Sequence, residues 1–391
     1  MTDLSGADWT QREDLARLVE VLGADNLRWV GGAVRDSLLG ADVHDIDAAT
    51  TLHPEAVMAA LKEAGIKVIP TGIDHGTVTA VLAGGNVEIT TLRKDVATDG
   101  RRATVAFAED WAEDASRRDF TINALYAHPL SLEVSDYFEG LADLAARRVR
   151  FIGEARERIA EDHLRILRYY RFQARFGAML DGEAEEACAD MAATLKGLSR
   201  ERVSGELLAI LALPEPLATV ERMFARGVLP VVLPEATPAT MAELAALCAF
   251  EADQAAKPAP LRRLAAILPA EPKLAEQVAA RLRLSTAQKK ALSRLARRGG
   301  DAASPRALAY REGPAMARDL LLLAGQSAEA LDGWEVPVFP LKGGQIVARG
   351  VGAGPEVARI LQAVEARWIA EKFPSESRVT AILDEELRQG A

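Results

Sequence analysis

Two aspartates separated by one residue, Asp45 and Asp47, are the side chains of this chain best suited to catalysis. In an extended segment alternate side chains share a face, so both carboxylates would point one way while Ile46 points into the apolar interior. Two carboxylates with room left for water and phosphate oxygens suit Mg²⁺, and paired Mg²⁺ ions serve attack on nucleoside triphosphates. For the triplet taken alone, an ordinary pair of solvated loop acids is the alternative.

A pair of glycines, Gly31 and Gly32, precedes these acids and separates an expected strand from an expected helix. Backbone amides and the helix N-terminus could approach a triphosphate here because no Cβ stands in the way. Arg35, one turn into the helix, could donate to the same phosphates, with Asp36 orienting it. A plain turn is the alternative, and the P-loop and dinucleotide-binding glycine patterns are both absent.

A third acid, Glu88, lies in the second expected strand of a hairpin over 77–92. Strand alternation would set it on the face opposite Val87 and Ile89. If this hairpin lies beside the Asp45 strand, Glu88 could complete a metal site or act on the attacking hydroxyl. A solvent-facing side chain is the alternative.

The segment over 117–125 carries polar groups that suit a nucleotide. Arg118, Asp119 and Asn123, in a helix expected over 117–125, would offer a donor fork, an acceptor and an amide to ribose and phosphate. A capped amphipathic helix is the alternative for that segment.

Asp162 and Arg165 stand three apart in a helix expected over 155–176. A carboxylate acceptor and a forked donor on one helix face could pair with the edge of a base. An intrahelical salt bridge is the alternative. Arg168, on the same helix, is expected to contribute to the nucleotide site.

The net charge of −10 and the pI near 5.3 argue at first against a nucleic-acid partner, because phosphate binding is driven by cationic side chains. The cations are unevenly distributed, however. Residues 281–298 hold seven of them and no acid, and residues 165–175 hold four arginines at helical spacing. We interpret these two stripes as tracks for a polyanion, with solvated helix faces as the alternative. The candidate RNA-binding residues are Arg171, Arg175, Arg281, Arg283, Lys289, Lys290, Arg294, Arg297 and Arg298.

Strand and helix patterns alternate up to about residue 140, and helical periodicity dominates afterwards. A chain of 391 residues with 49% hydrophobic and 5% aromatic residues is expected to form two to four domains, mostly helical. The expected elements are a strand over 27–30, a helix over 33–39, a strand over 45–48, a long mobile loop over 93–110, and helices over 155–176, 183–195 and 199–211.

The compartment is expected to be the cytoplasm. The two cysteines form no CxxC pair, and the N-terminal residues are polar and acidic, unlike a signal peptide. No apolar run approaches the roughly 20 residues needed to cross a bilayer, so no membrane partner is expected.

These segments follow one another as in a single family. The chain resembles the bacterial class II CCA-adding tRNA nucleotidyltransferases, relatives of bacterial poly(A) polymerases in the polymerase-beta-like superfamily. VGGAVRDSLLG with DIDAAT is similar to the family's catalytic motif, and RRDFTINALY to its ribose-reading motif. EDHLRILRYYRFQARFG is similar to its nucleotide-template helix. Beyond residue 177 the resemblance is only that the chain is helical.

The resemblance implies that Asp45 and Asp47 hold two Mg²⁺ ions with Glu88 near them. It implies that Asp162 and Arg165 accept CTP and then ATP in place of a nucleic-acid template. The activity would be addition of CCA to the 3′ end of tRNA, with pyrophosphate leaving. No DNA partner is expected.

The resemblance also implies an α+β protein with a polymerase-beta-like head, whose mixed sheet carries helices, followed by helical parts. The implied parts are a head over 1–140, a neck with the template helix over 141–211, a body over 212–300 and a tail over 301–391, the last two binding tRNA. An enzyme that adds only the terminal A, a poly(A) polymerase and a catalytically silent RNA-binding protein remain as alternatives. The loop expected over 93–110 favours full CCA or A-only addition.

Overall fold

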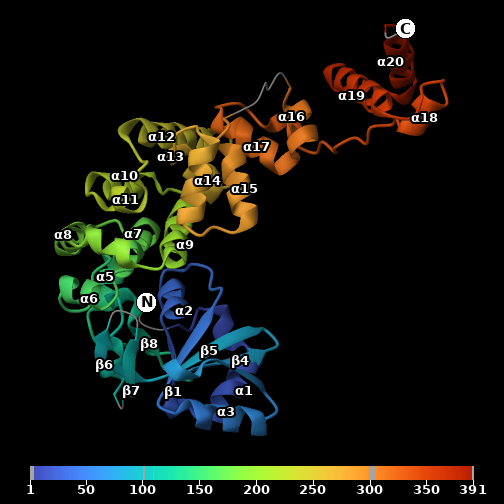
Figure 1. Ribbon diagram of the computed structural model, residues 1–391. Helices are drawn as coiled ribbons and strands as arrows, with labels where there is room; N and C mark the ends of the chain where they lie inside the picture. Colours follow the sequence, from blue (N-terminus) through green and yellow to red (C-terminus); the bar gives the residue numbers. More distant parts are fainter. Residues whose placement is uncertain (1–3, 100–101, 109, 299–303, 390–391) are drawn as a thin grey trace. The chain divides into compact units, whose positions relative to one another are not determined.

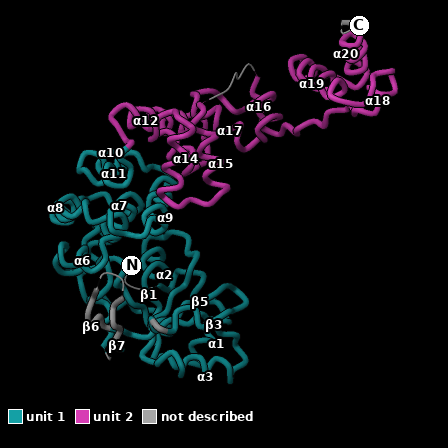
Figure 2. Tube along the Cα trace, in the orientation of Figure 1, with its two compact units in different colours: residues 1–234 teal, residues 235–391 magenta. Residues whose placement is uncertain are grey.

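The computed structural model describes residues 4–99, 102–108, 110–298 and 304–389 (Figure 1). The chain forms two compact units, residues 1–234 and residues 235–391 (Figure 2). Within the described ranges, every strand belongs to the first unit and the second unit is helical. The expected α+β class, with a mixed sheet followed by helices, is confirmed. The finer division into head, neck, body and tail stays a prediction.

A seven-stranded mixed sheet forms the first unit in the order β3-β4-β5-β2-β1-β8-β9. Strand β2 pairs antiparallel with β1 and parallel with β5, so the expected catalytic strand has a partner on each side. The expected strand over 27–30 and the expected hairpin are confirmed, and the strand expected over 45–48 lies at 46–50. The strands are β1 Leu27–Val30, β2 Ile46–Thr50, β3 Lys67–Gly72, β4 Thr77–Leu82, β5 Gly85–Thr91, β8 Leu125–Ala127 and β9 Val134–Asp136.

Three helices contact this sheet or one another. In α1 (Glu13–Leu22), buried Leu15, Leu18, Val19 and Leu22 recur at the spacing of one helix face. Helix α2 (Gly32–Leu38) packs on β1, β2 and β8, and α3 (Pro54–Glu63) packs on α1, β3 and β4. The turn from β1 into α2 therefore lies against the strand that carries Asp47.

The expectation of a structureless loop over 93–110 is wrong. Strands β6 (Arg93–Asp99) and β7 (Arg102–Phe107) pair antiparallel, with an irregularity between Asp95 and Ala97. Val and Thr recur in both halves of the segment, and β-branched residues favour strands even where hydrophobic periodicity is weak. Gly100 and Arg101, at the centre of the segment, lie outside the described residues.

The expectation of a helix over 117–125 is also wrong. Helix α4 (Trp111–Ser116) ends first, and a short 3₁₀ turn, η4 (Thr121–Asn123), precedes β8. The Thr121 amide donates to the Arg150 carbonyl and the Ile152 amide donates to the Asp119 carbonyl. These long-range bonds to the 150–152 segment hold residues 119–121 in a partly extended path, and tertiary contacts thus override the local helical signal.

The helix expected over 155–176 is broken into α6 (Ala155–Glu161) and α7 (Arg165–Phe176). Asp162 is extended, with φ −148° and ψ 103°. Its Oδ1 accepts from the Leu164 amide at 3.1 Å and its Oδ2 accepts from Arg202 at 2.6 Å. An aspartate that satisfies nearby amides through its side chain competes with helical hydrogen bonding, which explains the break.

The remaining helices of the first unit follow closely on one another. The helix expected over 183–195 is split into α8 (Gly182–Asp190) and the 3₁₀ helix η5 (Ala192–Gly197), whereas the helix expected over 199–211 is confirmed as α9 (Arg200–Leu211). Helices α10 (Leu217–Ala225) and α11 (Val228–Val232) complete this unit.

Proline occupies the first turn of many helices in the second unit, where its missing N–H costs nothing. No helix in the described ranges has the length and apolarity that crossing a membrane requires. The helices of this unit are α12 Pro238–Asp253, α13 Pro260–Ile267, α14 Pro272–Arg281, α15 Thr286–Leu295, α16 Pro305–Glu312, α17 Pro314–Leu323, α18 Gly343–Val347, α19 Pro355–Ala370 and α20 Glu376–Gln389.

Gly140, in α5 (Gly140–Ala145), should be intolerant of any side chain. A Cβ there would lie 2.3 Å from the Thr121 carbonyl oxygen, which belongs to η4. We expect Gly140→Ala to lower the free energy of unfolding of the first unit by about 2 kcal/mol or more, because the backbone must move.

Gly205 in α9 offers a matched control, since a Cβ there meets nothing within 4 Å. We expect Gly205→Ala to be neutral or to stabilise by up to about 1 kcal/mol. Urea denaturation followed by circular dichroism measures both variants, and equal effects would contradict the close approach at Gly140.

Candidate active site

Asp47 lies between two strands that carry the other candidate groups. In register, its Cα pairs with Val30 at the end of β1 and with Glu88 in β5. Asp45 is exposed and Asp47 is half-buried, while Ile46 between them is 5% exposed. Glu88 is exposed between two buried neighbours. The expected alternation is therefore confirmed for both segments, and Glu88 is brought beside Asp47.

Three acids and one arginine share an electrostatic environment at this point. Burial, together with the carboxylates of Glu88 and Asp45, raises the pKa of Asp47 to about 6, against the opposing charge of Arg118. A cation bound here would relieve the repulsion between the carboxylates. Among the described residues, no group of three or more His, Cys, Asp or Glu side chains is arranged to hold a metal ion. The metal prediction therefore concerns the aspartate pair.

Gly31 leaves β1 in the left-handed region, with φ 70°, and so makes the turn into α2. A Cβ on Gly31 would lie 3.8 Å from Nη1 of Arg118, and a Cβ on Gly32 would lie 3.7 Å from Nη2 of Arg35. Two guanidinium groups thus approach the glycine turn. Glycine keeps the backbone amides at this turn accessible beside those cations.

Arg118 is held by a buried acid, Asp114, to which the sequence analysis assigns no role. Its Nε donates to the Tyr126 hydroxyl at 2.8 Å and its Nη2 donates to Asp114 at 3.2 Å. The Tyr126 hydroxyl donates to the same oxygen of Asp114 at 2.6 Å. Arg117 donates to the other oxygen at 2.6 Å. Burial alone would raise the pKa of Asp114, but Arg118 and Arg117 hold that pKa below its ordinary value.

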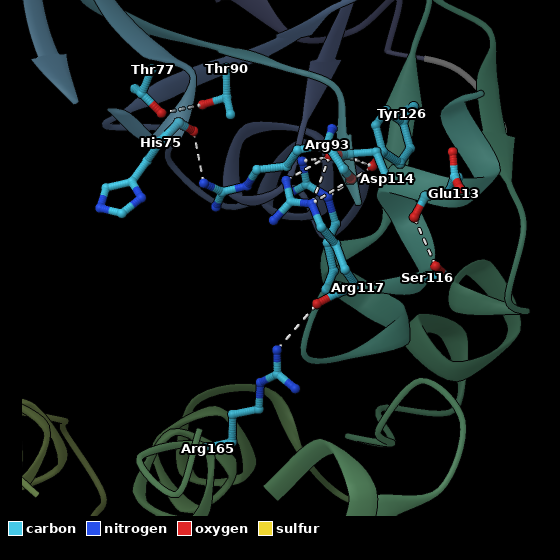
Figure 3. Close-up of polar contacts among 11 residues, drawn as sticks. His75, Thr77, Thr90, Arg93, Glu113, Asp114, Ser116, Arg117, Tyr126 and Arg165 are labelled. Carbon is cyan, nitrogen blue, oxygen red and sulfur yellow. Dashed lines mark hydrogen bonds and ion pairs between the residues drawn. The ribbon is translucent and has the colours of Figure 1, made fainter. Parts of the chain in front are cut away.

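Asp114 also ties the β6–β7 hairpin to the sheet. It accepts from the Arg93 amide at 3.2 Å, and Arg93 Nη1 donates to the His75 carbonyl at 2.9 Å. Arg165 Nη2, from α7, donates to the Arg117 carbonyl at 3.2 Å. Figure 3 shows these contacts running from the His75 turn through α4 to α7. Arg118, the candidate triphosphate group, and Arg165, the candidate base group, are therefore both connected to the short helix α4.

Arg35 is buried in a polar and aromatic environment. Its Nε donates to Asp36 at 2.8 Å, which agrees with the expected orienting role of Asp36, and its Nη1 donates to Asn123 Oδ1 at 2.5 Å. The guanidinium carbon lies 5.3 Å from the Phe172 ring centre and 4.3 Å from that of Phe176. A phosphate contact by Arg35 stays a prediction, because these partners already engage most of its donors.

A chain of hydrogen bonds continues from Asn123 into α7. Asn123 Nδ2 donates to Asp119 at 2.9 Å, and Arg168 Nε donates to the other Asp119 oxygen at 2.9 Å. Burial alone would raise the pKa of Asp119, but Arg168 and Asn123 hold it below its ordinary value. The expected ribose and phosphate groups are thus fixed to each other, although no single helix carries them.

Asp162 and Arg165 do not share a helix face, because the chain breaks between α6 and α7. Arg165 donates to Glu161, and its Nη1 also donates to the Arg158 carbonyl at 2.9 Å. Asp162 pairs instead with Arg202 of α9. The two residues remain three apart on adjoining segments, and their role in reading a base stays a prediction.

Most cations of the two basic stripes are ion-paired. Arg171 pairs with Glu206 at 2.6 Å and Arg175 with Asp36 at 3.1 Å. In the second unit, Arg281 pairs with Glu235, Arg294 with Glu312 and Arg298 with Glu243. Arg283 follows α14 in the left-handed region, with φ 52°.

Lys289, Lys290 and Arg297 differ from the other cations of their stripe. No ion pair is found for them among the described residues. They line a hollow of about 460 Å³ whose other lining residues are Glu276, Thr286, Ser293 and Arg294. This hollow is the part of the stripe with cations available to a polyanion.

The sequence analysis assigns no role to four residues of the site: Asp114, Tyr126, Arg202 and Glu206. Asp114 stands three and four residues before Arg117 and Arg118, a spacing that predicts helical ion pairs and could have revealed it. Arg202 and Glu206 reach the template region only through the packing of α9 on α7, and no local pattern indicates that contact.

Comparisons with known proteins agree on one family. Residues 27–150 match the Poly A polymerase head domain, and residues 177–240 match the probable RNA and SrmB-binding site of polymerase A. The mitochondrial CCA tRNA nucleotidyltransferase 1 of Mus musculus is 36% identical, covering 91% of this chain and 86% of its own length. The CCA-adding enzyme of Oceanobacillus iheyensis is 45% identical, covering 46% of this chain and 44% of its own length.

Solved structures agree in fold. The CCA-adding enzyme of Bacillus stearothermophilus, solved in complex with CTP, has a TM-score of 0.78 at 26% identity, covering 96% of this chain and 98% of its own. The CCA-adding enzyme of Thermotoga maritima, solved with tRNA, has a TM-score of 0.74 at 20% identity and covers 100% of this chain and 99% of its own. The second likeness shows the fold alone.

Asp47 should make the stability of the metal-free protein depend on pH. Its folded-state pKa of about 6 lies above the ordinary value of 3.8, so the folded state binds more protons between these values. Stability is therefore lost as pH rises through that window. Two pKa units correspond to about 3 kcal/mol. We expect Asp47→Asn to be more stable than the wild type by up to that amount near pH 8, and equally stable near pH 4.

Urea denaturation in the presence of EDTA at both pH values measures this difference. Asp42→Asn is the matched control, because Asp42 is an exposed acid five residues away. A stabilisation by Asp47→Asn that is the same at both pH values would argue against the raised pKa.

Proposed function

The chain belongs to the family of CCA-adding tRNA nucleotidyltransferases, and we propose that it adds CTP and then ATP to the 3′ end of tRNA without a nucleic-acid template. Membership rests on 36% identity over nearly the whole length of both chains. The observation that carries the proposal is that Asp47 and Glu88 lie side by side in register, next to the Gly31 turn that Arg118 approaches, with Asp45 near enough for its charge to act on Asp47.

Asp45 and Asp47 are the residues we assign to two Mg²⁺ ions. An all-oxygen donor set suits this hard cation, and a bound cation would relieve the burial of negative charge and the repulsion from Glu88 and Asp45 that raise the pKa of Asp47. When bound, the ions would neutralise the triphosphate and make the attacking hydroxyl more acidic.

The residues of the chain itself contribute position and charge. The amides at Gly31 and Gly32 and Nη1 of Arg118 would donate to the triphosphate, since Nε and Nη2 of Arg118 are committed to Tyr126 and Asp114. Glu88, in register with Asp47, is the acid we assign to the attacking 3′-hydroxyl. In-line attack on the α-phosphorus would then release pyrophosphate.

Base selection is assigned to Asp162 and Arg165, and ribose and phosphate contacts to Asp119, Asn123 and Arg168. The chain of bonds from Arg35 to Arg168 supports this assignment because it fixes these groups to one another. We assign to Arg35 a positioning role between α2 and α7, with its phosphate contact as the alternative.

The partner we propose is tRNA, bound through the helical parts of the chain, with the cytoplasm as the compartment. The RNA-binding match over residues 177–240 and the basic hollow on α15 support this partner. Addition of A alone, or of many A residues, is the alternative within the family. The match of residues 27–150 to a Poly A polymerase head domain supports testing this alternative.

Incubation with Mg²⁺, labelled CTP or ATP, and tRNA lacking one, two or three terminal nucleotides tests the activity. We expect two C residues and one A to be added to tRNA that lacks all three. An A-only enzyme would extend only tRNA that ends in CC, and a poly(A) polymerase would produce long products. No incorporation with any substrate would contradict all three.

In the same assay, Asp45→Ala and Asp47→Ala should each lower incorporation by at least about 10³-fold, because the metal-binding carboxylates are removed. Binding of tRNA, measured on filters, should be largely kept. Asp42→Ala is the matched control from the same loop and should retain full activity. Normal turnover by either variant of the pair would refute the metal assignment.

The hollow on α15 should contribute phosphate contacts. We expect Lys289→Ala with Lys290→Ala to weaken tRNA binding and to reduce the slope of log affinity against log salt by up to about 1.6, as for two lost phosphate contacts. Lys62→Ala with Lys67→Ala, which removes two exposed lysines of the first unit, is the matched control. Equal salt slopes for the two double variants would mean that the RNA does not contact the hollow on α15.

A further inference from the structure

Asp162 carries an ion pair that neither the motif nor the helical pattern explains. Its Oδ2 accepts from Nη2 of Arg202 at 2.6 Å, across 40 positions of sequence. Arg202 lies in the first turn of α9, which packs against α7. Both side chains are partly exposed, at 40% for Arg202 and 29% for Asp162. The pair therefore lies where a ligand could reach it.

The carboxylate of Asp162 is held by two contacts of different origin. Oδ1 accepts from the Leu164 amide at 3.1 Å, which fixes it to the start of α7, and Oδ2 is held by Arg202. An ionised carboxylate offers about four acceptor positions, so two contacts leave capacity for a further donor. The orientation of the remaining lone pairs is set jointly by α7 and α9.

We propose that Arg202 is a positioning residue for base selection, which holds the Asp162 carboxylate in a fixed direction as an acceptor for the amino group of the incoming base. The inference rests on the proposed function. It adds a residue outside the template motif, on a different helix, to the groups that decide which nucleotide is accepted.

The chemistry of the bases explains why a fixed carboxylate would select. Cytosine and adenine carry an exocyclic amino donor, whereas uracil and guanine carry a carbonyl acceptor at the equivalent position. A carboxylate can only accept, so it attracts the first pair and repels the second. A carboxylate that rotates away from the base loses this discrimination. The charged hydrogen bond from the arginine opposes that rotation.

Folding depends little on this pair, because exposed ion pairs contribute weakly to stability. Removal of Arg202 should therefore change selectivity while leaving the fold intact. This separates the proposed role from a merely structural one, which would lower the rate with every nucleotide alike.

The experiment compares kcat/KM for CTP and UTP on tRNA lacking its terminal nucleotides, for the full chain and its variants. We expect Arg202→Ala to lower the CTP/UTP ratio by about tenfold, a size typical of one positioned charged hydrogen bond. Arg202→Lys should restore part of the ratio, because it keeps the charge without the fork. Melting temperatures should remain close to that of the wild type.

Arg156→Ala is the matched control, since Arg156 forms an equally short, exposed ion pair with Asp190 at 2.6 Å, on helices that carry no proposed base contact. It should leave the CTP/UTP ratio unchanged. In the double variant Arg202→Ala with Asp162→Asn, the loss of selectivity should be no larger than in Asp162→Asn alone, because Arg202 acts through Asp162.

An unchanged CTP/UTP ratio in Arg202→Ala, or equal losses with every nucleotide, would overturn the inference while the proposed function stands. If the wild type incorporates neither CTP nor ATP, the proposed function fails first. Additive losses in the double variant would show that Arg202 acts by another route.

Discussion

Crowding of negative charge at one place in the sheet is the constraint on which the rest of the site depends. The parallel register of β2 and β5 sets Glu88 beside Asp47, and the charge of Asp45, two residues away, also acts on Asp47. Burial and these neighbours raise the pKa of Asp47 to about 6. A fold that needed only stability would not place carboxylates in this way. The loss of stability that this crowding causes in the cation-free protein is consistent with a site that works with cations bound.

The cations around this cluster are distributed so that they do not neutralise it. Arg118 lies near enough to oppose the charge of Asp47, but two of its nitrogens are committed to Asp114 and Tyr126. Arg35 is similarly engaged by Asp36 and Asn123. Buried acids that each hold an arginine keep these guanidinium groups in fixed directions. A phosphate could then meet donors that are already oriented, with little ordering left to do.

Sequence patterns predicted the parts of the site that alternation or a local turn decides. The β1 strand, the Gly31 turn, the exposure pattern around Asp45 and the strand face of Glu88 all follow from period two and from glycine. The parallel pairing of β5 with β2, which sets Glu88 beside Asp47, does not follow from a local pattern. The helix expected over 117–125 was wrong because backbone bonds to the 150–152 segment, which is distant in sequence, compete with local helical hydrogen bonds. The unbroken helix over 155–176 was wrong because the Asp162 side chain accepts from the Leu164 amide and so competes with helical hydrogen bonding at that point. The β6–β7 hairpin was missed because β-branched composition carried its signal.

The break at Asp162 has a consequence that an unbroken helix would lack. In a continuous helix, Asp162 and Arg165 would be close enough to pair with each other, and their charges would be mutually satisfied. The break instead gives each residue a separate partner, Arg202 for the acid and Glu161 for the arginine. Each group is held in its own direction, and neither blocks the other. The role in base recognition that we propose for this pair depends on the separation, because groups that satisfy each other have nothing left to offer a ligand.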